Sequence, residues 1–340
     1  MSASPESRVL VVGAGSMGLV IGYILTKGGA DVTFLVRPHR AEILSRPQLL
    51  YSYDDGQLQK FSQYKFITNP SDIKESEYNY IVITLDAYAL KSEAGTTLVK
   101  IIGDAVRGSQ TRIILGTAFI GVKSWFLKIS DIDEARVVWG GLAIHVYEPR
   151  KVTLPLHGGT DLRLLEQADQ AYTDKLGAGF TVDDSSPEVA RGFAQLWNAS
   201  RTSTCAVAPA TYLATSIVTM FVIFAASELL HWPSYEDVDI DEEHWVLAIE
   251  AMKELRGLSM CGKEGQMAME TTTAAGVRDQ FVAIEKLMRP LDWVAFSKYH
   301  HGMKVKAQDR AQLRDWVACG EAEGKPMSAT KELIKRVEEH

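Results

Sequence analysis

Three glycines near the N-terminus have the spacing of a loop that holds phosphate groups. Gly13, Gly15 and Gly18 form a Gly-x-Gly-x-x-Gly motif. The first glycine of such a loop allows a tight turn, the second lets the backbone approach a pyrophosphate, and the third lets the next helix pack closely. Ser16 and Met17 open that helix, whose free N–H groups attract an anion. These five residues are therefore predicted to bind a dinucleotide.

The elements that must position this loop follow from the hydrophobic pattern. Residues 9–12 form an aliphatic run typical of a buried parallel strand, residues 19–27 are helical, and residues 31–36 form the next strand. Further strands are expected at 80–85, 112–115 and 137–142, separated by helix-compatible segments such as 89–106. This alternation predicts an α/β fold with a doubly wound parallel sheet of the Rossmann type.

Two arginines, Arg37 and Arg40, follow the second predicted strand. An NAD-binding protein usually carries an acidic residue there for the ribose 2′-hydroxyl. Residues 36–40 contain no carboxylate, and guanidinium groups pair well with a phosphate dianion. A solvated surface cation is the other interpretation of Arg37. The sequence therefore favours NADP(H) as the cofactor.

The chain length and a change of pattern predict two domains. A chain of 340 residues exceeds the usual size of about 150 residues for one domain. Ser186 and Pro187 form a helix-start signal, and the residues that follow are mostly helical. We therefore predict a Rossmann domain over residues 1–185 and an all-helical domain for substrate binding and dimerisation over residues 186–340.

The composition argues against several classes of protein. A formal net charge of −7 disfavours a dedicated nucleic-acid binder. Cys205, Cys261 and Cys319 lack metal-ligand spacing, so we expect free thiols and no metal site. The acidic run at 236–243 is interpreted as a solvated loop. Residues 1–8 are polar and lack the apolar segment of a signal peptide, which predicts a cytoplasmic protein.

The longest uncharged stretch, residues 202–227, is long enough to raise the question of a membrane span. Pro209 and several Ser and Thr residues interrupt it, and its strongly apolar part, residues 217–226, is only half a span. We therefore expect a buried core or interface helix and no membrane association. Because residues 217–226 are more apolar than one helix of a small domain needs, a homodimer is predicted.

The first domain resembles a known family. The segments that carry the resemblance are 9–18, 32–37, 81–88 and the pair Gly140-Gly141. They are similar to ketopantoate reductase, the PanE/ApbA family, and the second domain is similar to that family in size and helical content. The resemblance implies NADPH-dependent reduction of a 2-keto acid in a cleft between a Rossmann domain and a helical domain.

The sequence departs from the family at the residues that do its chemistry. Where the family carries Lys before Ala-Tyr, this chain has Asp86. Where it reads Gln-Asn-Gly, this chain has residues 116–118, Gly-Thr-Ala. The family's proton-donating Lys follows a Trp by two residues, and this chain has Ala199 there, or Ser200 in the alternative register. Reduction of ketopantoate by the family's route is therefore not expected.

Ligands of doubly wound sheets bind at the carboxyl ends of the strands. Leu85 and Thr117 are therefore added to the predicted cofactor-binding residues, and Asp86 to the catalytic candidates. An acid at position 86 could protonate an oxygen or hold a cationic imine, and a helix cap is the alternative. Asn198 and Arg201 are further candidates, placed on one helix face with Cys205, where Arg201 could clamp a carboxylate or form a salt bridge.

A second group of titratable residues is predicted to supply a proton donor, namely Tyr299, His300, His301 or Lys304. It lies where the family brings a Ser and a Glu into its cleft. A helix hairpin with solvated ends is the other interpretation. Two adjacent histidines without a partner four residues away do not predict a metal site.

The sequence leaves two functions open. The first is an NADPH-dependent reductase that transfers hydride to a small carbonyl or imine compound other than ketopantoate. The second is a catalytically weak NADPH-binding homologue with a sensing or scaffolding role. Both need the cofactor, so the cofactor-binding residues do not separate them.

Overall fold

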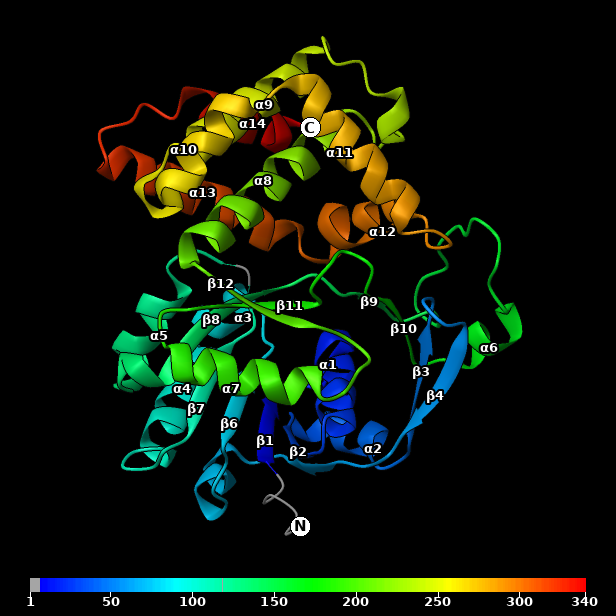
Figure 1. Ribbon diagram of the computed structural model, residues 1–340, viewed down its shortest axis with the longest axis vertical. Coiled ribbons are helices and arrows are strands. Elements are labelled where there is room, and N and C mark those ends of the chain that lie inside the picture. Colours follow the sequence, from blue (N-terminus) through cyan, green and yellow to red (C-terminus); the bar gives the residue numbers. More distant parts are fainter. Residues whose placement is uncertain (1–6, 118) are drawn as a thin grey trace. The chain divides into compact units, whose positions relative to one another are not determined.

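The computed structural model describes residues 7–117 and 119–340, without the side chains of residues 217–219. The chain forms two compact units (Figure 1). Unit 1 contains the described residues up to Thr153 together with Thr160–Ala208. Unit 2 contains Leu154–Gly159 and Pro209–His340.

Unit 1 is built on an eight-stranded sheet with the order β12-β11-β8-β7-β6-β1-β2-β5. The six strands from β5 to β8 pair in parallel, β11 is antiparallel to β8, and β12 is parallel to β11. The strands are β1 (Ser7–Val12), β2 (Ala30–Leu35), β5 (Lys65–Ile67), β6 (Tyr80–Ile83), β7 (Arg112–Leu115), β8 (Val137–Leu142), β11 (Phe180–Asp183) and β12 (Cys205–Ala208). The order of the parallel strands is that of a Rossmann fold, which confirms the predicted fold class.

The central strand β1 shows why the aliphatic run was a dependable signal. Val9–Val12 pairs with β2 on one side and with β6 on the other. All four of its residues are at most 1% exposed. A strand that is hydrogen-bonded on both edges and covered by helices on both faces is inaccessible to water, so all its side chains are apolar.

Helices surround this sheet, and α1 carries the glycine motif at its start. The helices of unit 1 are α1 (Ser16–Lys27), α2 (Ala41–Leu44), α3 (Ala87–Lys91), α4 (Glu93–Ala105), α5 (Val122–Ser130), α6 (Leu162–Gln167) and α7 (Pro187–Asn198), with 3₁₀ turns η1 (Pro38–Arg40), η2 (Pro70–Glu75) and η3 (Glu134–Arg136). The predicted helical segment 89–106 is two helices, α3 and α4. Ser92 separates them and caps α4 by accepting the Gly95 N–H.

A second sheet with the order β4-β3-β10-β9 covers α1. Its strands are β3 (Gln48–Ser52), β4 (Gln57–Phe61), β9 (His145–Tyr147) and β10 (Gln170–Thr173). Tyr23 of α1 contacts Phe61 of β4 with ring centroids 5.7 Å apart. The sequence analysis missed this sheet, because its strands are short and Gln residues interrupt their apolar pattern.

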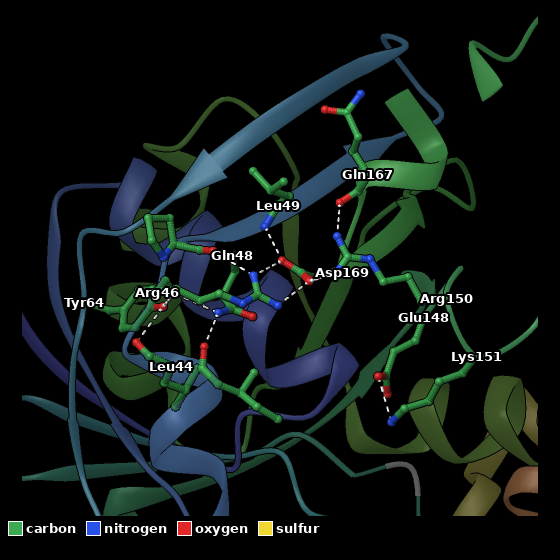
Figure 2. Close-up of polar contacts among 12 residues, drawn as sticks. Leu44, Arg46, Gln48, Leu49, Tyr64, Glu148, Arg150, Lys151, Gln167 and Asp169 are labelled. Atoms are coloured by element: carbon green, nitrogen blue, oxygen red, sulfur yellow. Dashed lines mark hydrogen bonds and ion pairs between the residues drawn. The ribbon is translucent and has the colours of Figure 1, made fainter. Parts of the chain in front are cut away.

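A cluster of charged side chains links the segments that precede β3 and β10 in the second sheet (Figure 2). Arg46 donates two hydrogen bonds of 2.8 and 2.7 Å to the Asp169 carboxylate, which also accepts from the Leu49 N–H at 2.9 Å. Arg150 lies 3.3 Å from the same carboxylate. Burial alone would raise the pKa of Asp169, but these partners lower it. The cluster therefore joins the chain before β3 to the start of β10.

The boundary between the units differs from the prediction at residue 185. Residues 186–208 belong to unit 1, because α7 packs on the sheet and β12 extends it. Trp197 of α7 is fully buried and lies with its ring centroid 5.3 Å from that of Phe180 in β11. The change from strand-rich to helix-rich sequence therefore precedes the structural boundary.

Unit 2 is helical. Its elements are α8 (Ala210–Leu229), η4 (Tyr235–Asp237), α9 (Glu243–Arg256), η5 (Ser259–Cys261), α10 (Gly262–Thr271), α11 (Ala274–Leu287), α12 (Trp293–Tyr299), the π-helical turn η6 (His300–Lys304), α13 (Lys306–Ala322) and α14 (Ser328–Glu339). Four fully buried aromatic side chains lie in its core, namely Tyr235, Trp245, Phe281 and Trp293, with Trp316 buried on α13.

Helix α8 contains the apolar run at 217–226. By length and composition it could cross a membrane, but 67% of its most apolar window is buried inside the structure, as expected of a core helix. Phe221 and the residues up to Ala226 are all buried in unit 2, while the side chains of residues 217–219 lie outside the description. Residues 221–226 are thus already covered within one chain, and the homodimer stays a prediction.

Replacing Gly18 with Ala tests the packing of α1 against β1. Helix propensity alone favours Ala by about 1 kcal/mol. A Cβ at this position would, however, overlap the Gly13 carbonyl oxygen, which is backbone and cannot move aside. We expect the packing effect to win and the free energy of unfolding, measured in urea, to fall by about 1–3 kcal/mol.

Gly257→Ala is the matched control, since its Cβ would have neighbours no closer than 3.4 Å and its φ is −73°. This variant should unfold at the wild-type urea concentration or slightly above it. A Gly18→Ala protein as stable as this control would contradict the inferred close contact.

Candidate functional site

The glycine motif forms a turn between β1 and α1, and each of its three positions suits glycine for a different physical reason. Gly13 has a φ of +102°, which is unfavourable for other residues, and its N–H donates to the Leu35 carbonyl at 3.0 Å. Gly18 lies directly against the Gly13 carbonyl. Gly15 is exposed, and a Cβ there would meet nothing within 4 Å. The turn therefore leaves open space above its second glycine.

The first turn of α1 is suited to an anion. It contains no acidic residue, and no side chain caps it. Its free N–H groups and the positive end of the helix dipole face the open space at Gly15. The Ser16 hydroxyl is buried and has no hydrogen-bond partner among the described residues. A phosphate oxygen would satisfy this hydroxyl and these N–H groups, so the residues fit a dinucleotide pyrophosphate.

Thr84 holds the glycine turn from the neighbouring strand. It follows β6, and its hydroxyl lies 2.9 Å from the Val12 carbonyl and 3.3 Å from the Gly13 carbonyl. The next residue, Leu85, packs against Gly13, with its Cδ2 3.2 Å from the position a Cβ would take. The sequence analysis named Leu85 and missed Thr84. A hydroxyl residue at the end of the strand beside β1 was the available signal.

The two arginines after β2 differ in their contacts. Arg40 donates a 2.9 Å hydrogen bond to the Ala14 carbonyl in the glycine turn. Arg37 is exposed, and its guanidinium pairs with no described residue. Both arginines therefore follow the end of β2. Arg40 is partly used in holding the glycine turn, and Arg37 is available to a ligand.

Asp86 caps a helix. It is the N-cap of α3, and its Oδ1 accepts the Ala89 N–H at 2.7 Å. The carboxylate is exposed and follows the end of β6. The capping alternative is therefore realised, and the remaining lone pairs of the carboxylate still face solvent at the carboxyl edge of the sheet.

Thr117 lies after β7, at the same edge. Its side chain is 6% exposed, and its carbonyl accepts the Trp139 indole N–H at 2.6 Å. The Trp139 backbone N–H donates to the buried Asp183 carboxylate at 2.8 Å. These contacts fix the Thr117 backbone next to the neighbouring strand β8. In the resemblance Thr117 stands where the family carries its Asn. Ala118, the next residue, lies outside the described residues.

The prediction that Asn198, Arg201 and Cys205 share one helix face is wrong. Helix α7 ends at Asn198, Arg201 has a left-handed φ of 54°, and Cys205 begins β12. The Asn198 side chain accepts the Cys205 N–H at 2.6 Å and donates to its carbonyl at 3.1 Å. These bonds to the Cys205 backbone end the helix at Asn198, so Arg201 and Cys205 lie outside it and share no helix face with Asn198.

The structure also places this segment away from the glycine turn. A Cβ on Gly28, which follows α1, would overlap the Leu196 carbonyl of α7. The end of α7 therefore lies beside the C-terminal end of α1, whereas the glycine turn lies at the N-terminal end. A 12-residue helix separates the two ends by about 18 Å.

In unit 2, His300 and His301 lie in the π-helical turn η6 rather than at a solvated hairpin end. His301 stacks on Phe224 with ring centroids 3.8 Å apart, and its Nδ1 lies 2.8 Å from Asp309 Oδ2. His300 stacks on Phe296 at 5.6 Å, and Lys304 is exposed. No cluster of three or more metal-ligating side chains occurs within residues 7–117 and 119–340.

Burial controls the protonation of the His301–Asp309 pair. It lowers the pKa of His301 to about 3. It raises the pKa of Asp309 to about 8, with Arg310 opposing the rise and Glu228 adding to it. The pair therefore holds one proton and no net charge at neutral pH. The sequence analysis named His301 and missed Asp309, which lies eight residues further along the chain.

Comparison with known proteins gives one family match within unit 1. Residues 9–122 match the model of the family described as ketopantoate reductase PanE/ApbA. This match covers the glycine turn, both arginines, Asp86 and Thr117. No curated protein matches the chain by sequence.

Solved structures share the fold over the whole chain. A 2-dehydropantoate 2-reductase from Geobacter metallireducens GS-15 has a TM-score of 0.66 at 17% identity, over 98% of this chain and 99% of that chain. The Methylococcus capsulatus enzyme of the same name gives 0.66 at 14%, over 97% and 96%. A D-mandelate dehydrogenase solved with NADH and anilino(oxo)acetate gives 0.63 at 13%, over 97% of each chain. At these identities the likeness establishes the fold alone.

The His301–Asp309 pair predicts a pH dependence of stability. Between about pH 6.5 and 8 the native state keeps the Asp309 proton, whereas the unfolded chain has no counterpart to it. Fewer protons in the unfolded state mean that stability falls as pH rises. Below about pH 6.5 an unfolded His301 binds a compensating proton, so the slope should flatten.

Urea unfolding at pH 6.5 and at pH 8.5 measures this effect. The wild-type protein should lose up to about 2 kcal/mol more over this interval than Asp309→Asn, which carries no titrating carboxyl. Equal losses in the two proteins would show that Asp309 titrates near its ordinary value in the native state.

Proposed function

We propose that the protein is an NADP(H)-dependent oxidoreductase of the ketopantoate reductase type that acts on a C=O or C=N group of a small molecule. The observation that carries the proposal is the glycine turn. Its open space at Gly15, its unpartnered Ser16 hydroxyl and the N-terminus of α1 suit a pyrophosphate. The family match over residues 9–122 includes this turn and supports the same proposal.

The residues of unit 1 would divide the cofactor between them. Gly13, Gly15, Ser16, Met17 and Gly18 would bind the pyrophosphate through backbone N–H groups and one hydroxyl. Arg37 would pair with the 2′-phosphate, for which its guanidinium is available, and Arg40 would hold the turn while offering its remaining N–H groups. Leu85 and Thr117 follow the next strands and would border the nicotinamide end. When bound, NADPH supplies a hydride.

The reduced oxygen or nitrogen must also receive a proton. A positioned acid is worth about 10²–10⁴ in rate. His300 and Lys304 are the proposed donors of unit 2. His301 is partly buried and bonded to Asp309, and its ring contacts that of His300, so we assign it the positioning of this neighbour. The Asn198 side chain is bonded to the Cys205 backbone through both its amide nitrogen and its amide oxygen, and it is assigned a structural role.

The charge at Asp86 defines the proposed substrate class. The resemblance implies an ammonium group there and another near Ala199 or Ser200, and this chain has neither. A carboxylate at position 86 repels a 2-keto acid and attracts a cation. We therefore propose a neutral ketone or aldehyde, or a protonated imine, as the substrate, and ketopantoate as a poor one. We further propose a cytoplasmic homodimer without nucleic-acid or membrane partners.

A second candidate function is a catalytically weak NADPH-binding protein with a sensing or scaffolding role. The observation that favours it is the use of the Asp86 carboxylate as a helix cap. It predicts NADPH binding with no turnover across 2-keto acids, aldehydes, ketones and cyclic imines. NADPH oxidation with any of these compounds would exclude it.

Arg37→Ala tests the cofactor assignment. Loss of one charge-assisted contact to the 2′-phosphate costs about 1.5–3 kcal/mol, which is roughly 10–150-fold in affinity. Titration calorimetry should therefore show a large loss for NADPH and almost none for NADH. Arg40→Ala is the comparison, because it also releases the Ala14 carbonyl and should weaken both cofactors. Equal losses in Arg37→Ala would remove the 2′-phosphate assignment.

Asp86→Asn tests the substrate class. Asn caps a helix as well as Asp does, so the variant removes the charge and keeps α3. Steady-state NADPH oxidation should show lower turnover of the best neutral or cationic substrate and unchanged NADPH affinity. If the wild-type protein instead reduced ketopantoate with a kcat/KM above about 10⁴ M⁻¹ s⁻¹, another residue would have replaced the family's lysine and the proposed substrate class would be wrong.

A further inference from the structure

A second polar hollow lies in unit 1, at the end of α7. Its volume is about 280 Å³, enough for a ligand of a few non-hydrogen atoms. It is lined by Asp174, Gly177, Asn198 and the loop residues 201–204. It lies beside the C-terminal end of α1, whereas the glycine turn lies at the N-terminal end, and no residue of that turn lines it. The hollow is therefore separate from the proposed cofactor site.

Arg201 gives this hollow an unpaired positive charge. Its side chain is exposed, and among the residues that the structure describes no carboxylate lies within ion-pair distance of it. Its left-handed backbone is held by the bond from its N–H to the Asn198 carbonyl at 3.2 Å. Asn198 in turn is bonded to both backbone groups of Cys205. The loop that carries the guanidinium is thus fixed at both ends.

Asp174 also lines this hollow, and one oxygen of its carboxylate lacks a hydrogen-bond donor among the described residues. The Ser203 hydroxyl lies beside its carboxylate and lowers its pKa, and this hydroxyl accepts the buried Trp197 indole N–H at 3.0 Å. Asp174 Oδ1 is buried and accepts no hydrogen bond from a described residue. A Cβ on Gly179 would overlap this carboxylate, so only glycine leaves it room. Burial, with Asp54 adding repulsion, raises the pKa of Asp174 to about 6.

We propose that this hollow binds a small zwitterion with one carboxylate and one ammonium group, of the α-amino acid class. The carboxylate would pair with Arg201, and the ammonium group would donate to the Asp174 carboxylate. A simple anion would leave Asp174 unsatisfied and be repelled by it, and a simple cation would be repelled by Arg201. A ligand with both charges satisfies both groups. The proposal does not depend on the cofactor or on catalysis.

Titration calorimetry at about pH 7.5, where Asp174 is ionised, tests the ligand class. The probes are L-alanine, L-lactate, acetate and ethylamine. L-alanine should bind most tightly, L-lactate more weakly because a hydroxyl replaces the ammonium group, and the two single-charge probes at least about tenfold more weakly than L-alanine. At about pH 5, where Asp174 is protonated, the preference for L-alanine over L-lactate should disappear.

Three variants locate the binding. Arg201→Asn removes the charge with a residue that accepts a left-handed backbone, and it should abolish binding of both acids. Asp174→Asn keeps the shape and should reduce L-alanine affinity to that of L-lactate. Arg163→Asn, which removes an exposed arginine in α6, is the control and should bind as the wild type does.

Two outcomes would overturn the proposal. The first is no heat from any probe at millimolar concentration with the wild-type protein. The second is L-alanine binding that survives in both Arg201→Asn and Asp174→Asn. Thermal melts check that each variant is folded, and NADPH affinity, which should not change, separates a failure here from a failure of the proposed cofactor site.

Discussion

The direct contact between Gly18 and the Gly13 carbonyl is the constraint on which the rest of unit 1 depends. Without a side chain between them, α1 lies against the end of β1, so the helix N-terminus and its partial positive charge face the carboxyl edge of the sheet. Thr84 holds the same turn from β6, and Arg40 holds it from the segment after β2. The glycine turn is therefore made of backbone that three neighbouring segments hold in place.

The same helix explains the position of the other features of unit 1. The second sheet covers α1, and Phe61 of that sheet contacts Tyr23. A 2.7 Å hydrogen bond from Arg46 to Asp169 links the segments that precede β3 and β10 (Figure 2). At the C-terminal end of α1, the last turn of α7 approaches Gly28. One helix thus supports the glycine turn at its N-terminal end and lies beside the hollow with Arg201 and Asp174 at its C-terminal end.

Unit 2 buries charge in its helical core, which constrains the roles of its titratable residues. Glu228 is bonded to both Lys306 and Arg310 at 2.6 Å, and its side chain is 11% exposed. Beside it, His301 and Asp309 share a proton in a site that penalises either charge. Removing one partner of a buried ion pair leaves the other charge uncompensated. The bonds of Glu228 to Lys306 and Arg310 therefore stabilise the packing of α8 against α13. The exposed Lys304 is under no such constraint.

The sequence by itself determined the Rossmann core and its glycine turn. Strands β1, β7 and β8 and the start of α1 follow from local signals, namely continuous aliphatic runs, glycine spacing and the resemblance over the first domain. Tertiary structure alone decided what depends on distant partners. The short strands of the second sheet are stabilised by packing on α1, and Asn198 ends α7 by bonding to β12. Asp309 of α13 meets His301 of η6. Local spacing could not predict these contacts, because packing between remote segments overrides it.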